Sequence, residues 1–161
     1  MPRRGPATLA SVAAFALYAA TAGHDVIGGA GIDAAKFGYM SRILGVPHPP
    51  GYPLYMLIGW AFSCMPLGTL LFRMSVLSAL FAAATVWLLA VLLETLGCAP
   101  IIAAAVALLA GAGRVFWSQS IIPEVYTLHT ALVMGTLTAL VAWRPSKGES
   151  LLYVADRKSV V

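Results

Sequence analysis

The sequence predicts an all-α, polytopic membrane protein. Hydrophobic residues make up 60% of the 161 residues and charged residues only 10%, and the mean hydropathy is +0.87. A soluble domain carries nearer a quarter charged residues. Because a spanning helix needs roughly 20 apolar residues, a chain of this length has room for about four spans together with their connections.

Four apolar stretches are the candidate spans, and they cover residues 7–22, 70–93, 99–113 and 121–143. The second would extend about 36 Å as a helix, which is enough to cross a bilayer. The first and third are short for a full span. The first also fits a secretory signal, because Arg3 and Arg4 precede it and Ala20-Thr21-Ala22 ends it. An uncleaved first helix suits the later spans better.

The polar connection between the first two spans is predicted to contain two short helices. Apolar residues recur at three- and four-residue steps over residues 34–44, which indicates a helix. Asp33 then takes the N-cap position and Gly45 the C′ position. A second apolar run, residues 54–65, has about 12 residues, too few to cross a bilayer. We expect it to be an interfacial helix.

A proline corner, residues 47–53, separates these two helices. Its prolines fix φ and remove backbone donors, so the segment is neither helix nor central strand. A rigid polar corner among apolar segments is costly unless it lines a site or a wet interface. His48 is predicted mainly to hydrogen-bond the turn rather than to act in acid–base chemistry. The residues assigned to this structural motif are His48, Pro49, Pro50, Gly51, Tyr52 and Pro53.

Charge and cysteine placement exclude some functions and leave the topology open. No basic cluster with interleaved aromatics is present, so nucleic-acid binding is not expected. Cys64 and Cys98 fall on opposite sides of the second span, so no disulfide is expected between them. No Cys/His spacing predicts a metal site.

The basic residues flanking the spans are equally numerous on the two sides of the membrane, so their count does not decide the orientation. We choose a cytoplasmic N-terminus, with these basic residues outside: Lys36, Arg42, Arg73 and Arg114.

The last six residues, 156–161, resemble a translated sequencing adapter more than natural protein. An ordinary charged tail is the other interpretation. If the tail is adapter-derived, residues 1–155 are expected to be the N-terminal part of a longer membrane domain.

One pattern carries a family resemblance. Asp33 is followed, after fourteen residues, by the sequence HPPGYPLY, residues 48–55. This pattern resembles a family of polytopic membrane proteins, first described as a domain of unknown function, that includes an animal transmembrane protein O-mannosyltransferase and bacterial relatives. The likeness continues through residues 73–81, 116–120 and 124–128, and it covers about residues 20–143.

The resemblance implies a GT-C glycosyltransferase fold and an active site at the outer face, in a bacterial inner membrane. It implies transfer of a sugar, with mannose as a candidate, from a polyprenyl-phosphate donor to a protein or glycan hydroxyl, without a further cofactor. Asp33 aligns with the catalytic base of such enzymes. The departure is Lys36, where relatives commonly carry Glu. Lys36 is expected to pair with Asp33, to contact donor phosphate, or to mark lost activity.

Four further residues are weighed for the same site. Arg73 and Arg114 are candidates to bind phosphate, with snorkelling to the interface as the equal alternative. Glu124 is a substrate-binding candidate, and His129, five residues further on, is a weaker one that does not share its helical face. The alternative function is a non-catalytic membrane protein, a transporter or assembly subunit, and Lys36 is its motivation.

Overall fold

The computed structural model describes residues 4–23 and 31–143, and within these ranges it contains seven helices and no strand. The predicted all-α class is therefore confirmed. The predictions for Arg3 and for residues 156–161 fall outside the described residues. The helices are α1 (Gly5–Ala20), α2 (Gly31–Ile43), α3 (Pro53–Ser63), α4 (Leu70–Thr95), α5 (Pro100–Gly111), α6 (Arg114–Ser120) and α7 (Tyr126–Ala142).

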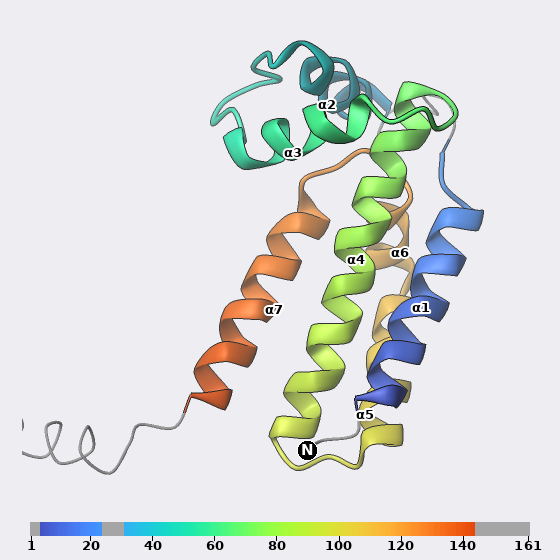
Figure 1. The fold of residues 1–161 in the computed structure, drawn as a ribbon, viewed down its shortest axis with the longest axis vertical. Coiled ribbons are helices and arrows are strands. Elements are labelled where there is room, and N and C mark those ends of the chain that lie inside the picture. The colour runs from blue at the N-terminus through green and yellow to red at the C-terminus, as the bar shows by residue number, and fades with distance from the viewer. Residues whose placement is uncertain (1–3, 24–30, 144–161) are drawn as a thin grey trace, which may run out of the picture.

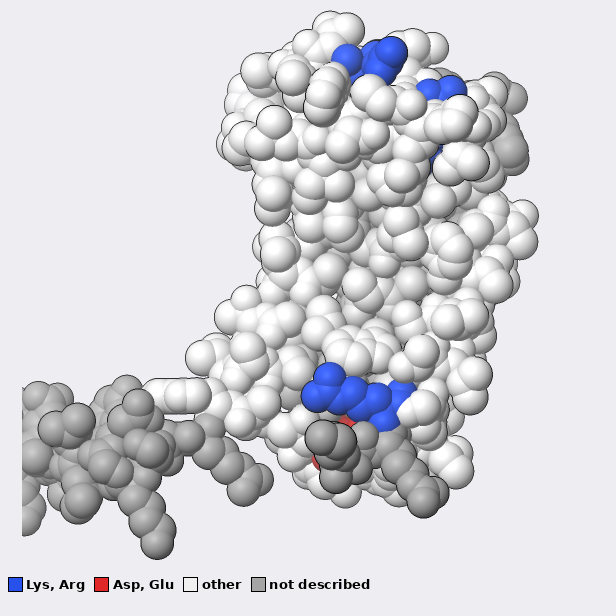
Figure 2. Space-filling view, in the orientation of Figure 1, with Lys and Arg blue, Asp and Glu red and all other residues white. Residues whose placement is uncertain are grey.

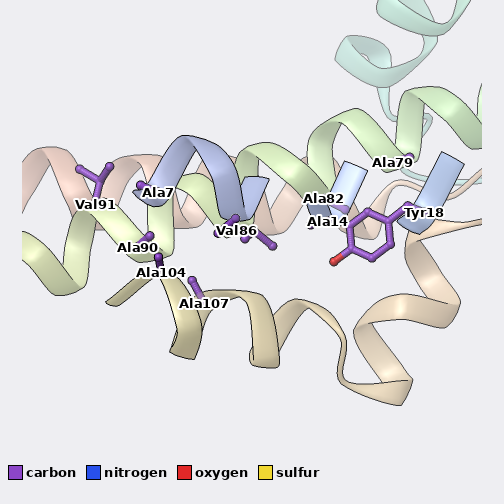
Figure 3. Packing of buried hydrophobic residues seen from close by; sticks show 11 residues of the cluster. Ala7, Ala14, Tyr18, Ala79, Ala82, Val86, Ala90, Val91, Ala104 and Ala107 are labelled. Atoms are coloured by element: carbon purple, nitrogen blue, oxygen red, sulfur yellow. The ribbon is translucent and has the colours of Figure 1, made fainter. Parts of the chain in front are cut away.

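Helix α4 is the central helix of the molecule (Figure 1). It packs against α1 and α5 on one side and against α7 on the other. We call α1, α4 and α5, with the buried side chains between them, the bundle. Its core consists largely of alanines, with Tyr18, Val86 and Val91 as larger members (Figure 3). Small side chains let the helix backbones approach closely, which is the usual device for packing helices in an apolar environment.

The bundle is closest where α5 ends. Gly111 is buried, and a Cβ added there would lie 2.7 Å from both the Tyr18 hydroxyl and Cγ2 of Val86. The Tyr18 hydroxyl donates to the Gly111 carbonyl at 2.8 Å. Glycine is therefore required at this position by the space that α1 and α4 leave for it.

The structure does not confirm four spans. Only α4, with 26 residues, is long and apolar enough by itself to cross a membrane among the described helices. Helices α5 and α6 pass the same test together, but the chain bends by 72° between them. With 16 and 17 residues, α1 and α7 extend only about 24–26 Å, less than the roughly 30 Å of a hydrocarbon core. The fourth apolar stretch is shortened because α7 begins at Tyr126, after the loop that contains Pro123.

Charge lies at the two ends of the molecule on the face shown in Figure 2. Lysine and arginine side chains gather near the upper end and near the lower end, and the band between them is uncharged on this face. Such a distribution suits a molecule that crosses an apolar layer, because charged groups are costly there.

The upper end of α4 carries a separate layer, formed by α2, α3 and residues 44–52, which we call the cap (Figure 1). Its core is aromatic and methionine-rich, in contrast to the alanines of the bundle. The buried members of this core, including those from α4 and α7, are Phe37, Tyr55, Met56, Met74, Leu77 and Leu128. The two short predicted helices are thus present, the second as 11 residues of α3.

Both predicted ends of α2 are wrong by a few residues. The helix begins at Gly31, so Asp33 lies inside its first turn rather than at the N-cap. At the other end Leu44, not Gly45, adopts the left-handed conformation, with φ 52°. The Gly45 amide donates to the Met40 carbonyl at 2.8 Å. A Cβ on Gly45 would lie 2.8 Å from Sδ of Met40, so close packing explains this glycine.

Candidate functional site

The candidate site lies where the cap meets the loop between α6 and α7, and three segments that are distant in sequence contribute to it. Asp33 comes from α2, His48 from the proline corner, and Glu124 from the loop 121–125 between α6 and α7. The Glu124 side chain is buried, with 7% of the residue exposed. Burial, and to a lesser extent the negative charge of Asp33, raise the pKa of Glu124 to about 6, against the lowering effect of the Val125 amide and of His48. The charges of Asp33 and His48 therefore act electrostatically on the Glu124 carboxyl.

Asp33 and Lys36 form an exposed ion pair. The Lys36 Nζ lies 3.2 Å from Oδ1 of Asp33, one helical turn earlier. One of the three expectations for Lys36, pairing with Asp33, is therefore confirmed. Asp33 also lies in the first turn of α2, where exposed amide groups and the helix dipole favour a carboxylate.

The proline corner is fixed to α2 and α3 by aromatic packing. The Phe37 ring makes edge-to-face contacts with His48, Tyr52 and Tyr55 at centroid distances of 5.4, 5.4 and 5.5 Å. His48 and Tyr52 also pack edge to face, at 5.3 Å. Within the turn, Nδ1 of His48 lies 3.0 Å from the Pro49 carbonyl, and the Gly51 amide donates to the His48 carbonyl at 2.8 Å.

A polar cluster lies beneath this aromatic layer. The Ser78 hydroxyl of α4 donates to the Glu124 carbonyl at 3.3 Å and accepts from the Glu124 amide at 3.2 Å. The Tyr55 hydroxyl lies beside Ser78 and near the Glu124 carboxyl, yet it makes no hydrogen bond of good geometry with any described residue. Burial, together with the Glu124 charge, raises the pKa of Tyr55, so its phenol remains a proton donor.

An apolar cavity of about 350 Å³ adjoins this cluster between the start of α3 and the start of α7. Tyr55 and Val125 line it, and His129 lies on its α7 side. His129 itself is exposed, unlike Glu124. The prediction that the two residues point to different faces of one helix does not apply, because α7 begins at Tyr126 and Glu124 lies in the loop before it.

The two arginines assigned to phosphate lie elsewhere. Arg73 donates to the carbonyls of Leu67, Ser63 and Gly68 at 2.7, 2.6 and 3.0 Å, so it braces the turn between α3 and α4. A guanidinium has about five N–H donors, and these three bonds leave about two for a ligand. Arg114 is exposed at the start of α6.

Two residues of the cluster were not predicted from the sequence as site residues. Tyr55 is read most easily as an interfacial aromatic, but it is 1% exposed. Ser78 lies in the motif of residues 73–81, three residues after Ser75. Two serine hydroxyls three residues apart on one face of a mostly apolar helix are the signal that points to a polar contact there. Within residues 4–23 and 31–143, no group of three His, Cys, Asp or Glu residues is arranged to hold a metal ion.

Comparison with known proteins identifies both a family and a similar individual protein. Residues 33–156 match the family described as the protein O-mannosyl-transferase TMEM260 N-terminal domain. The chain is also 35% identical over 147 residues to the protein O-mannosyl-transferase TMEM260 of Mus musculus. That alignment covers 86% of this chain and 20% of the mouse protein, so the chain spans about a fifth of the length of this relative. No solved structure matches.

Proposed function

Because this chain belongs to the family of TMEM260 N-terminal domains of protein O-mannosyl-transferases, we propose that it forms the acid-bearing part of a membrane glycosyltransferase. The match confirms the family resemblance inferred from the pattern of Asp33 and the proline corner. The observation that carries the proposal is a pair of acids in different settings: Asp33 is exposed in the first turn of α2, and Glu124 is buried in the loop between α6 and α7, where the Asp33 charge helps to raise its pKa.

In the proposed reaction Asp33 is the general base. Its carboxylate accepts the proton of an acceptor hydroxyl, and the oxygen of that hydroxyl then forms a bond to the anomeric carbon of the sugar. The bond between that carbon and the phosphate oxygen breaks, and its electron pair leaves with polyprenyl phosphate. Asp33 suits this task because it is exposed in the first turn of α2 and accessible to an acceptor.

Glu124 and Lys36 define the electrostatics around this base. Lys36 pairs with Asp33 in the resting site and balances its negative charge. Glu124 is buried, and with a pKa of about 6 it carries a proton part of the time near neutral pH. We assign Glu124 to orientation of the acceptor or the sugar, as a hydrogen-bonding carboxyl next to the base.

The substrate side of the proposal follows from the family and the composition. The donor is a polyprenyl-phosphate sugar, with mannose as the first candidate, since the mouse relative is named an O-mannosyl-transferase. The acceptor is a hydroxyl of a protein or a glycan. The apolar surface of α4 and the uncharged band in Figure 2 support a location in a membrane, with the cap at one of its faces.

The test is an Asp33→Asn substitution in the full-length protein that contains this chain. Membranes carrying it are given a polyprenyl-phosphate mannose with a radiolabelled sugar and a serine- and threonine-rich acceptor peptide. Loss of the general base is expected to lower transfer at least about a hundredfold, while the amount of folded protein in the membrane stays the same.

The matched control is Glu94→Gln, which removes a carboxylate from the last turn of α4, at the end far from the cap. This variant is expected to transfer sugar at the normal rate. Undiminished transfer by the Asp33→Asn protein would remove Asp33 from the mechanism.

A non-catalytic membrane protein is the second candidate function, because the Lys36 ammonium already occupies Asp33. The same assay separates the two functions. If the unmodified full-length protein transfers no sugar, but a Lys36→Glu variant with the residue common in relatives does, then this chain is a member whose activity has been lost.

A further inference from the structure

Ser78 is unusual among the buried hydroxyl groups of this protein. Most of the others bond back to their own helix, as Ser41 does to the Phe37 carbonyl and Ser120 to the Phe116 carbonyl. Ser78 is fully buried and instead bonds across to Glu124, with its oxygen serving both the amide and the carbonyl of that residue. A single side chain thus satisfies both backbone groups of one buried loop residue.

Glu124 needs such a support because it belongs to no helix. Its segment, residues 121–125, connects α6 to α7 and lacks the regular bonds that fix a helical residue. An unpaired buried backbone group is costly, so the two bonds to Ser78 determine where this loop lies. The position of the Glu124 side chain follows from the position of its backbone.

A neighbouring serine of α4, Ser75, also hydrogen-bonds to a segment outside the helix. The Ser75 hydroxyl, one turn before Ser78, donates to the Gly23 carbonyl at 3.2 Å. The Gly23 amide in turn donates to the Ile121 carbonyl at 2.8 Å. Ser75 and Ser78 therefore hold two connected segments, the end of the α1 region and the loop that carries Glu124.

We propose that Ser78 is a positioning residue that holds the Glu124 carboxyl in place beside Asp33. The groups that face Glu124 are Asp33 from α2, His48 from the proline corner and Tyr55 from α3. The significance of this placement for sugar transfer rests on the proposed function. The position of the Glu124 carboxyl does not depend on that function, so its position and its role in transfer are tested separately.

The test measures the Glu124 carboxyl directly in this chain, reconstituted in phosphatidylcholine nanodiscs. A water-soluble carbodiimide and glycine ethyl ester modify protonated carboxyls, and peptide mass spectrometry gives the rate at Glu124 as a function of pH. In the unmodified chain we expect slow modification with a midpoint near pH 6. In Ser78→Ala the loop is released, so the rate is expected to rise at least about tenfold and the midpoint to move to lower pH.

Two further comparisons separate positioning from a loss of folding. Ser41→Ala removes an equally buried hydroxyl whose bond to Phe37 stays within α2, and it is expected to leave Glu124 unchanged. Ser78→Thr and Ser78→Val have nearly the same shape and differ in the hydroxyl. In Ser78→Thr, Glu124 should therefore be modified at the same rate and with the same pH midpoint as in the unmodified chain. In Ser78→Val, both values should match those of Ser78→Ala. Equal rates and midpoints for threonine and valine, or no change in Ser78→Ala, would overturn the proposal.

In the full-length protein, Ser78→Ala is expected to shift the pH profile of transfer in the same direction as the labelling midpoint. A failure of Asp33→Asn to abolish transfer would refute the proposed function. It would leave the labelling result at Glu124 unaffected.

Discussion

The bundle and the cap are built on different principles, although both pack against α4. The bundle is held by small residues and one close glycine contact, and its core cluster contains no buried charged side chain among the described residues. The cap is held by edge-to-face aromatic contacts around Phe37, and the buried Glu124 lies in the loop 121–125, which packs against the cap. Close helix packing suits a scaffold, whereas an aromatic layer with short helices and loops brings polar groups from several segments together.

The candidate functional residues therefore lie in the less regular region of the molecule. Asp33, His48 and Glu124 come from a first turn, a corner and a loop, which a rigid helix supports from below. Loops positioned by a rigid scaffold are where binding and catalytic groups are commonly found. If the bundle and the cap are independently packed regions, a substitution in one should destabilise that region and leave the other folded.

The largest expected effect comes from Phe37→Ala in the cap. Phe37 is 2% exposed and contacts three rings, so its removal is expected to cost about 3–5 kcal/mol. Hydrogen exchange followed by mass spectrometry should show accelerated exchange in α2 and the proline corner, with α1 and α5 unchanged. Phe116→Ala, which removes a ring packed against the bundle, should show the opposite pattern. Equal acceleration in both regions would mean that cap and bundle unfold as one unit.

A smaller effect is expected from Gly111→Ala in the bundle. The new Cβ would meet Tyr18 and Val86 at 2.7 Å, and such overpacking costs about 1–3 kcal/mol. The midpoint of thermal unfolding in detergent should fall. Gly5→Ala is the matched control, because nothing lies within 4 Å of the added atom. An unchanged midpoint for Gly111→Ala would show that the bundle is looser than its packing indicates.

The smallest effect concerns the pH dependence of the cap. Because the pKa of Glu124 is raised from 4.5 to about 6, the folded protein binds this proton more tightly than the unfolded chain does. Stability is therefore expected to fall as pH rises from about 4.5 through about 6, by up to about 2 kcal/mol in total. Glu124→Gln should remove this part of the pH dependence in thermal unfolding, and Glu94→Gln should retain it. A stability that rises over this window in the unmodified protein, with no change in Glu124→Gln, would contradict the buried position of Glu124.

Part of the site was predictable because its signals are local. The repeat of apolar residues predicted α2, the short run after the proline corner predicted α3, and the longest apolar stretch predicted α4. Asp33 and Glu124 were each selected as rare acids in an apolar chain. The bend between α5 and α6 and the late start of α7 were not predicted, since hydropathy alone does not show where a continuous apolar stretch breaks.

The sequence by itself determined the all-α class, the family, and the acids that deserve a functional test, because composition, helical periodicity and the spacing of Asp33 from the proline corner are properties of the chain alone. Only the tertiary structure decided which of these residues meet. The packing of α7 and α3 on α4 buries Tyr55 and Glu124 and gives Ser78 its partner. It also directs Arg73 to backbone carbonyls. Such pairings depend on how helices lie against one another, and no local pattern of residues contains that information.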